Sequence, residues 1–314
     1  MKPLIIIVGP TAVGKTALGI ALAQALNGEI ISGDSVQIYR KLNIGSAKPT
    51  LEEQANIPHY LLDILDPDEP FTVAQFQSLA KKHIQDIQSR DKVPIVVGGT
   101  GLYIRSLLDP FEFPQQGSEE VRESWQKFLA KWEKEALHSE LAKRDPESAK
   151  RLHPNDTVRI IRALEVSQLA GKPYSEVRGN HDLHYPPLDP SIVYVGLTAP
   201  RDIIYERINL RCEKMIEAGL LEETLGLIKE GYSPKLKPLQ SIGYRHALMY
   251  LFGKVTREEM IRLFQRDTRH FAKRQLTWFR RDPRLTWFDT YKEKPASILE
   301  SIIATCNRIQ SRLE

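Results

Sequence analysis

The sequence predicts an α/β fold in which a parallel sheet is flanked by helices and carries a mostly helical inserted domain. Three observations favour this fold. Short aliphatic runs alternate with helical stretches through the N-terminal third, as βαβ units require. Pro, Gln and Gly cluster just after residue 110, and only helical periodicity continues beyond them. A further aliphatic run returns at residue 192, so the helical part interrupts a single core.

The elements of the N-terminal third follow from hydrophobic patterning. The run Leu4–Val8 is continuous and bounded by Pro3 and Gly9, as expected for a strand buried on both faces. A second short strand is closed by Gly33, and a third aliphatic run is stopped by Gly98-Gly99. Apolar residues at 76, 79, 80, 84 and 87 form a helical stripe, and an earlier helix is expected to end at Asn27-Gly28. The predicted elements are, in order, the strand Leu4–Val8, the helix Lys15–Leu26, the strand Glu29–Ser32, the helix Phe71–Arg90 and the strand Val93–Val97.

The predicted inserted domain covers residues 112–190, and the core covers residues 1–111 and 191–314. The composition of Phe111–Gly117 predicts a hinge. Beyond it, Val121, Trp125, Phe128 and Trp132 recur at helical spacing. The strand Ile192–Leu197 returns the chain to the sheet, and the rest is predicted to be mostly helical.

A second helix of the insertion is predicted at His153–Gly171. Asn155 or Asp156 can serve as its N-cap, because both side chains accept hydrogen bonds from free amides of a first turn. Gly171 lies just past the expected end, where a left-handed residue commonly terminates a helix.

Composition excludes several classes of protein. The chain has 314 residues, of which 41% are hydrophobic and 27% charged, which is the balance of a globular protein. No apolar run approaches the roughly 18 residues that a membrane span needs. Two cysteines and no CxxC provide neither a disulfide framework nor a zinc site. We therefore expect a reduced, cytoplasmic protein without a membrane partner or an obligate protein partner, and a monomer.

The net charge of +4 is concentrated in one segment. Residues 257–284 contain nine Lys or Arg and four Asp or Glu, so this segment alone carries +5. A basic segment of this kind predicts a polyanionic partner.

A phosphate-binding loop follows the first strand. The sequence GPTAVGKT fits GxxxxGK[ST] between a strand and a helix, so the core is predicted to be P-loop NTPase-like. Its backbone amides and the helix N-terminus attract anions, Lys15 supplies a positive charge, and Thr16 offers a hydroxyl ligand to Mg²⁺. The candidate diphosphate-binding residues are Gly9, Pro10, Thr11, Ala12, Val13, Gly14, Lys15 and Thr16.

The acidic residue expected near such a loop lies in an unusual place. The third strand ends in Gly98-Gly99-Thr100 rather than in the Asp of a Walker B strand. Instead, Asp34 follows the second strand, at the sheet edge where ligands bind. It could hold Mg²⁺ through water or accept a proton. This arrangement predicts a di- or triphosphate site that is not built to hydrolyse a nucleotide.

Seven motifs in order give the sequence a family resemblance. They are GPTAVGKT at 9–16, DSVQIYR at 34–40, IGSAKP at 44–49, GGTGLY at 98–103, HPNDTVRIIRALE at 153–165, IGYR at 242–245 and TRHFAKRQLTWFR at 268–280. Together they resemble the bacterial tRNA dimethylallyltransferases of the IPP transferase family, over about residues 4–285. The P-loop is shared with many kinases, whereas DSxQxYR, GGTGLY and AKRQxTWFR together are highly specific.

The resemblance implies a reaction. A dimethylallyl group would pass from dimethylallyl diphosphate to N6 of adenosine 37, just 3′ of the anticodon in tRNA, and diphosphate would leave. Asp34 would be the general base, and the P-loop with Mg²⁺ would stabilise the leaving group. The alternative for Asp34 is a water-bridged Mg²⁺ ligand or the N-cap of the next segment.

The resemblance also implies roles for side chains around this centre. Arg207 and Arg211 would face the diphosphate, or else form a surface arginine pair. Thr100 would contact tRNA or the transferred group, or else be a turn residue. Gln37 would pair with an adenine edge, and Ser35 would fix the turn or meet the base. The catalytic set is then Asp34, Lys15, Thr16, Thr100, Arg207 and Arg211.

Binding of the anticodon stem-loop is implied for a larger set of residues, with the insertion gripping the RNA. Arg262, Arg266, Arg269 and Lys273 lie on one helical face, and Trp278 is expected to be partly core. The implied tRNA-binding residues are Asp34, Ser35, Val36, Gln37, Thr100, Arg122, Val158, Arg159, Ile160, Ile161, Arg162, Ile242, Gly243, Tyr244, Arg245, Lys273, Arg274, Gln275, Trp278 and Arg280.

Three alternatives remain open at this point. A relative that prenylates free AMP, ADP or ATP would share the P-loop and Asp34 but would need neither the insertion nor the basic face. A small-molecule kinase would share the P-loop alone. A non-catalytic RNA-binding module would not need an intact phosphate site.

Overall fold

The computed structural model describes residues 2–110, 117–177 and 185–313. They form two compact units, one of Met1–Asp109 with Tyr185–Glu314 and the other of Pro110–His184. We call them the core unit and the inserted unit. Of the predicted hinge, residues 111–116 lie outside the described part of the chain. Within that part, no helix combines the length and the apolar character needed to cross a membrane.

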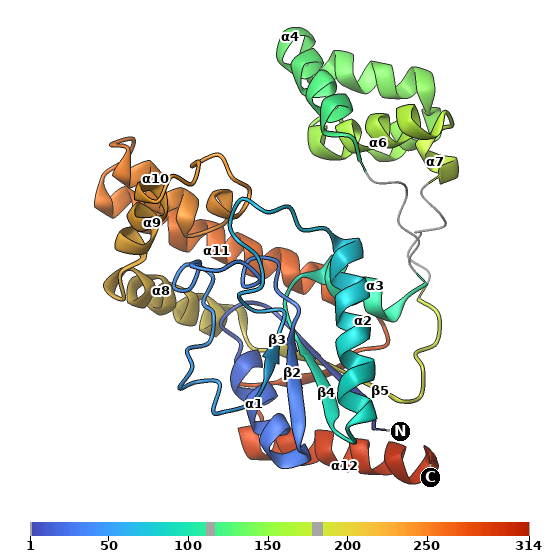
Figure 1. The fold of residues 1–314 in the computed structure, drawn as a ribbon, viewed down its shortest axis with the longest axis vertical. Helices are drawn as coiled ribbons and strands as arrows, with labels where there is room; N and C mark the ends of the chain where they lie inside the picture. Colours follow the sequence, from blue (N-terminus) through green and yellow to red (C-terminus); the bar gives the residue numbers. More distant parts are fainter. Residues whose placement is uncertain (1, 111–116, 178–184, 314) are drawn as a thin grey trace. The chain divides into compact units, whose positions relative to one another are not determined.

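A parallel sheet organises the core unit (Figure 1). Among the described residues it has six strands in the order β3-β2-β4-β1-β5-β6. All the neighbouring pairs are parallel, which confirms the predicted fold class. The strands are β1 Leu4–Val8, β2 Gly28–Ser32, β3 His59–Tyr60, β4 Val93–Val97, β5 Ile192–Thr198 and β6 Thr286–Asp289.

The sequence patterns did not reveal the two edge strands β3 and β6. Each is short, with two residues in β3 and four in β6, and its residues are largely half-exposed. Neither therefore forms the aliphatic run that marks a strand buried on both faces. Pairing with β2 and β5 gives them their conformation.

Helices cover both faces of the sheet (Figure 1). On one face, alternate residues of β1 such as Ile5 and Ile7 pack against α1 (Lys15–Leu26) and α12 (Pro295–Leu313). On the other face, Ile6 and Val8 pack with α2 (Val73–Ser89) and α3 (Gly101–Leu108). Every residue of β1 is buried, as its aliphatic composition requires.

Further helices form a second core within the core unit. They are α8 Arg201–Glu217, α9 Leu220–Lys229, the 3₁₀ turn η1 Pro238–Gln240, α10 Tyr244–Leu251 and α11 Arg257–Phe279. Ile38, Tyr39 and Leu42, from the segment after β2, are buried in the same cluster. This packing ties the segment that begins with Asp34 to the C-terminal helices.

The inserted unit is a small helical bundle. Its helices are α4 Glu119–Arg144, α5 Pro146–Arg151, α6 Thr157–Ala170 and α7 Tyr174–Val177. Glu133 interrupts α4 with φ of 66°, so α4 is two helices joined by a kink. Asp156 caps α6 and Gly171 ends it in the left-handed conformation, as predicted. Trp125, Leu137, Leu141 and Leu164 belong to a core of its own.

A buried carboxylate joins α4 and α6 within the inserted unit. Glu165 is fully buried and accepts hydrogen bonds from Arg122 Nη2 at 2.9 Å and from Arg162 Nη1 at 2.8 Å. Both guanidinium groups remain partly exposed. The carboxylate thus holds together two arginines that the sequence assigned to RNA binding.

Loss of this carboxylate should loosen the inserted unit. We expect Glu165→Ala to destabilise it by about 2–3 kcal/mol, less than a fully buried pair because both arginines reach solvent. Hydrogen exchange of α4 and α6 amides should rise, with a smaller rise for Glu165→Gln, which keeps a hydrogen-bond acceptor. Unchanged protection of α6 in Glu165→Ala would contradict this role.

Candidate active site

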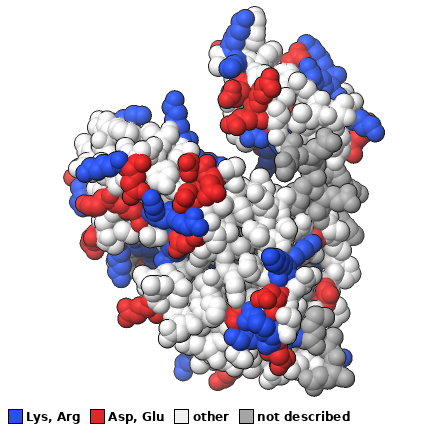
Figure 2. Space-filling model, in the orientation of Figure 1, with Lys and Arg blue, Asp and Glu red and all other residues white. Residues whose placement is uncertain are grey.

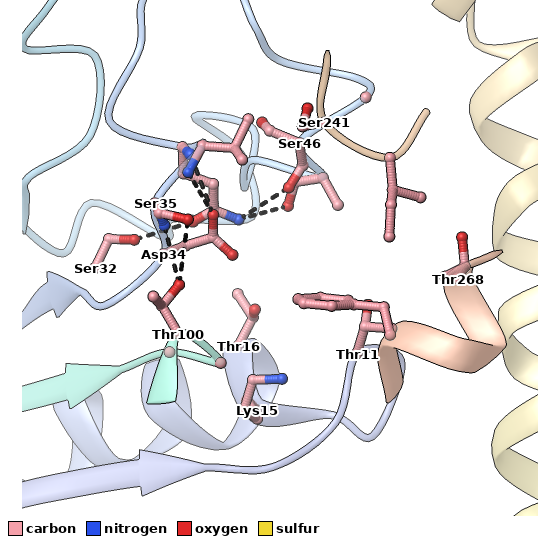
Figure 3. Close-up of a pocket in the computed structure, with 18 of the residues that line it drawn as sticks. Thr11, Lys15, Thr16, Ser32, Asp34, Ser35, Ser46, Thr100, Ser241 and Thr268 are labelled. Atoms are coloured by element: carbon pink, nitrogen blue, oxygen red, sulfur yellow. Dashed lines mark hydrogen bonds between the residues drawn. The ribbon is translucent and has the colours of Figure 1, made fainter. Parts of the chain in front are cut away.

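Three loops meet at the carboxyl edge of the sheet. The phosphate loop follows β1, Asp34 lies two residues after β2, and Thr100 follows β4. Because β2, β4 and β1 are neighbours, these loops lie side by side. They line a cavity of about 400 Å³ in the core unit, to which Lys15, Thr16, Asp34 and Thr100 contribute (Figure 3).

Close contact between two glycines brings the loops after β2 and β4 together. A Cβ atom on Gly98 would lie 2.3 Å from the carbonyl oxygen of Gly33, which leaves no room for a side chain. Thr100 N donates to the same carbonyl at 3.3 Å. This close approach of two backbone segments beside Asp34 explains why Gly98, the first residue of GGTGLY, is a glycine.

The phosphate loop has the conformation that an anion site needs. Gly14, at the N-cap of α1, has φ of 102°, which L-residues with a side chain rarely adopt. Lys15 Nζ donates to Pro10 O at 2.7 Å. Burial, together with the positive charge of Arg211, lowers the pKa of Lys15 to about 7. An anion bound beside this ammonium would favour its charged form.

The two arginines of α8 occupy different surroundings. Arg211 lines the cavity, and its Nη1 donates to Thr11 Oγ1 of the phosphate loop at 3.2 Å. Burial lowers the pKa of Arg211. Arg207 lies one turn earlier, does not line this cavity, and donates from Nη1 to Thr290 Oγ1 at 3.4 Å. The arrangement favours Arg211 as the diphosphate contact.

Asp34 uses one oxygen for structure and leaves the other available. Its Oδ1 accepts from Val36 N at 2.8 Å and Gln37 N at 3.3 Å, which fixes the turn after β2. Among the described residues, Oδ2 has no hydrogen-bond partner. The carboxylate lines the cavity (Figure 3). Capping of the turn is therefore compatible with a chemical role for Oδ2.

Thr100 is held against the same turn. Its Oγ1 accepts from Ser35 N at 3.2 Å and lies 3.5 Å from Ser35 Oγ (Figure 3). The side chain is the N-cap of α3 in sequence, but it makes no capping bond to that helix. Its hydroxyl instead joins the loops after β2 and β4 at the cavity wall.

The Gln37 side-chain amide is already hydrogen-bonded within the protein. Its Oε1 accepts from Ser32 Oγ at 3.1 Å, and its Nε2 donates to Ser46 O at 3.3 Å and Ala47 O at 3.0 Å. The expected pairing of this amide with an adenine edge would therefore require these bonds to break. In the structure Gln37 braces the segment 44–49 against β2.

Glu223 is an organising residue that the sequence analysis missed. Its carboxylate accepts from the backbone amides of Asn43, Ile44 and Gly45, and from the Tyr244 hydroxyl at 2.5 Å. It thus joins IGSAKP to IGYR across α9. Glu223 lies next to Glu222 in an amphipathic helix, so no pattern distinguished it from a surface residue.

The cavity also has an apolar wall. Met215, Ile242, Phe264 and Phe271 contribute to it from α8, α11 and the segment before α10. Cys212 also lines it, and burial raises the pKa of its thiol to about 11, which keeps the thiol protonated. This wall offers space for a small hydrocarbon group next to a phosphate site.

Two buried polar atoms at the cavity lack partners. Among the described residues, only His59 Nε2, Ser148 Oγ and Ser241 Oγ are buried without a hydrogen bond, and the first and last belong to cavity-lining residues. Buried polar groups are normally paired. Both are therefore candidates for contact with a bound substrate. The sequence left His59 open between a substrate contact and a structural histidine, and it did not point to Ser241.

The predicted RNA-binding residues of α11 separate into two groups. Lys273, Arg274 and Arg280 make no ion pair among the described residues, and Trp278 is 38% exposed. Arg262 pairs with Glu259 and Arg266 with Asp267. Charges of both signs are interspersed over α8–α10 on the face drawn in Figure 2. Of the predicted RNA-binding set, the cations without an ion pair thus lie toward the C-terminal end of α11, whereas Gln275 is buried.

The IGYR motif is mostly internal. Tyr244 is fully buried, and Gly243 is buried beside it. Arg245 lines the cavity and pairs with Asp267 at 2.6 Å. His246 accepts from Gly243 N at 3.3 Å and contacts Asp267 Oδ2 at 3.1 Å. Direct contact with RNA is therefore open to Arg245 and Ile242 but not to Tyr244.

Within the inserted unit, the VRIIR segment has an exposed side and a buried side. Val158 is 78% exposed and Arg159 is also exposed, whereas Ile160 and Ile161 belong to the core of the unit. Val158 and Arg159 are available to an RNA, and the two isoleucines support the helix that presents them.

Comparison with known proteins gives consistent matches. The family model described as IPP transferase matches residues 37–282. A tRNA dimethylallyltransferase of Desulfitobacterium hafniense strain DSM 10664 / DCB-2 is 76% identical over all 314 residues, covering 100% of both chains. One from Carboxydothermus hydrogenoformans is 49% identical over 309 residues, covering 96% of each.

Solved structures agree with these matches. The tRNA isopentenylpyrophosphate transferase of Bacillus halodurans superposes with a TM-score of 0.71 at 41% identity, covering 99% of both chains. A eukaryotic dimethylallyltransferase acting on tRNA superposes with a TM-score of 0.80 at 28% identity, covering 99% of this chain and 80% of that one. With its phosphate loop, its aspartate at the sheet edge and these relatives, the chain belongs to the IPP transferase family of transferases.

Proposed function

We propose that the protein transfers a dimethylallyl group from dimethylallyl diphosphate to N6 of adenosine 37 in tRNA, the nucleotide 3′ of the anticodon. One observation carries the proposal: the same cavity contains a phosphate loop, a carboxylate with an unpaired oxygen and an apolar wall. A phosphoryl donor needs no apolar wall, whereas a prenyl diphosphate needs both parts.

Departure of the diphosphate is the first requirement. As the C–O bond breaks, negative charge grows on the bridging oxygen, and groups already aimed at it lower the barrier. Thr11, Lys15 and Thr16 of the phosphate loop line the cavity together with Arg211, and we assign the leaving phosphates to this part of it. Arg211 is suited to this role because its planar fork binds two phosphate oxygens at once.

The donor atoms at this position suit Mg²⁺. Thr16 lines the cavity and its hydroxyl is a hard oxygen donor, and Mg²⁺ prefers oxygen ligands and retains several waters. Among the described residues, no group of three His, Cys, Asp or Glu could enclose a metal. A bound Mg²⁺ would neutralise charge on the diphosphate, and the substrate phosphates would complete its coordination.

Proton removal from the acceptor is assigned to Asp34. The lone pair of the adenine amine is delocalised into the ring, so N6 must lose a proton as it bonds to C1 of the dimethylallyl group. In the balanced step, the N6–C1 bond forms, the C1–O bond breaks, diphosphate leaves, and the proton passes to Asp34 Oδ2.

RNA recognition is assigned to the exposed residues of the predicted set. Lys273, Arg274 and Arg280 would hold phosphates, and Trp278 offers an aromatic face for stacking. Val158 and Arg159 of the inserted unit are exposed for the anticodon stem-loop. Ile160, Ile161, Tyr244 and Gln275 are buried and would position these neighbours.

A transfer assay tests the proposed function. Labelled dimethylallyl diphosphate and Mg²⁺ are incubated with unmodified tRNA, with the same tRNA carrying guanosine at position 37, and with AMP. Label is expected only in the first. Label in AMP would support a free-nucleotide prenyltransferase, and label in the guanosine variant would disprove the assigned acceptor. No label anywhere, with phosphoryl transfer from ATP, would support a kinase.

A further inference from the structure

Gln275 lies where the phosphate loop, the glycine loop 98–101 and helix α11 meet. The residue is only 5% exposed. Thr11 N donates to its Oε1 at 2.9 Å, and its Nε2 donates to Gly99 O at 3.0 Å. One amide therefore joins the loop after β1 to the loop after β4, and both loops line the cavity.

The glycines of the 98–101 loop allow α11 to approach this closely. A Cβ atom on Gly99 would lie 2.2 Å from Gln275 Nε2, and one on Gly101 would lie 2.2 Å from Trp278 Nε1. Both obstacles are side chains of α11. The GGTGLY and AKRQLTWFR motifs are thus two sides of one packing contact.

The same turn of α11 carries unpaired basic side chains. Lys273 and Arg274 precede Gln275 directly and make no ion pair among the described residues, and Arg274 lines the cavity. A helix moves as a rigid element, so a displacement of α11 when these cations bind RNA would also displace the Gln275 amide. Through its hydrogen bond to Thr11 N, the amide would then displace Thr11 in the phosphate loop.

We propose that Gln275 is a positioning residue that couples RNA docking on α11 to the geometry of the phosphate loop. Gln275 also lines the cavity, but its amide is committed to Thr11 N and Gly99 O, so in this proposal it acts through the two loops rather than on the reacting atoms. The inference deepens the proposed function, on which it rests for the identity of the two substrates. Because coupling between two ligands is reciprocal, RNA should tighten diphosphate binding by the same factor as diphosphate tightens RNA binding.

Binding measurements test the coupling without turnover. The affinity of an unmodified anticodon stem-loop RNA is measured with and without inorganic pyrophosphate and Mg²⁺. For the unsubstituted protein, pyrophosphate should tighten RNA binding about 5–20-fold, a typical coupling between sites. For Gln275→Met, which keeps the length but not the hydrogen bonds, this factor should fall below about 2-fold, with RNA affinity alone changed less than about 3-fold.

Gln265→Met provides the matched control on the same helix. Gln265 Nε2 donates to Glu213 Oε1 at 3.0 Å and touches neither loop, so this variant should retain the full coupling factor. If Gln275→Met weakens RNA binding alone but keeps the coupling factor, Gln275 contacts RNA directly and the inference is wrong. Absence of coupling in the unsubstituted protein also overturns it.

A double-mutant cycle tests the contact itself. Gly99→Ala should lower kcat about 10–100-fold, because its methyl group displaces the Gln275 amide. In a Gln275→Ala background the obstacle is gone, since the next atom, Gly9 O, is 3.6 Å away. Gly99→Ala should then cost less than about 3-fold more. If Gly99→Ala and Gln275→Ala lower kcat additively, the two residues are not in contact and the inference is wrong. Failure of RNA binding by the unsubstituted protein would instead count against the proposed function.

Discussion

Asp34→Asn should lower kcat by about 10³-fold, within the range that a positioned general base contributes. The substitution is unusually clean because the amide oxygen it introduces can still accept from Val36 N and Gln37 N, the two donors that hold the turn through Asp34 Oδ1. Only the basic oxygen is replaced by an amide nitrogen. Single-turnover transfer and RNA binding should be measured on the same preparation, and RNA affinity is expected to stay within about 3-fold.

Two outcomes would contradict the assignment of Asp34. Unchanged turnover with weakened RNA binding would make Asp34 a binding residue. Recovery of activity at high Mg²⁺ would make it a metal ligand rather than a base. Asp68→Asn, which removes an exposed acid of the same core unit, serves as the control and should leave turnover unchanged.

Lys15→Met should lower turnover by about 10²–10³-fold, the usual cost of losing one donor aimed at developing negative charge. RNA affinity in the absence of diphosphate should change little, because Lys15 lies on the phosphate loop and not on the basic end of α11. Inorganic pyrophosphate binding should weaken strongly. Equal loss of RNA and pyrophosphate binding would indicate a disrupted fold instead.

The lowered pKa of Lys15 predicts opposite effects on stability and function. Between pH 7 and 10.5 the unfolded chain carries a proton on Lys15 that the folded chain has released, so this group makes stability rise with pH across that window. Below pH 7 the folded protein bears the full cost of the buried charge. Lys15→Met should therefore raise Tm at pH 6 more than at pH 10.

The same titration predicts how pyrophosphate binding depends on pH. Above pH 7 the free protein has lost the charge on Lys15, so binding of an anion must take up a proton. The affinity for inorganic pyrophosphate should fall as pH rises from 7 to 9, and Lys15→Met should remove this dependence. If Lys15→Met changes Tm by the same amount at pH 6 and at pH 10, the pKa of Lys15 is not lowered in the folded protein.

The elements that could be predicted from the sequence are those whose structure depends on residues close together in the chain. The buried strands β1, β4 and β5 were predicted from their apolar runs, because residues shielded on both faces are mostly aliphatic, and β2 was predicted although it contains the buried Glu29. The phosphate loop was predicted because glycines, a lysine and a hydroxyl at fixed spacing must follow a strand to bind phosphate. The capped helix α6 was predicted from Asp156 and Gly171 in the same way.

The candidate site was only partly predictable, because burial and pairing depend on residues distant in sequence. Periodicity placed Arg262 and Arg266 on a basic face, but their charges are matched by Glu259 and Asp267. Gln37 looked free to pair with a base, yet Ser46 and Ala47 occupy its amide.

The sequence by itself determined the four inner strands of the sheet, the phosphate loop and the family, because each depends on residues adjacent in the chain or on motifs that match in order. Only the tertiary structure decided which motif residues face the cavity. Thr11, Gly99 and Gln275 are separated by up to 264 positions, yet one amide joins them. Such contacts arise when packed helices and loops approach within hydrogen-bond distance, and no local pattern records that approach.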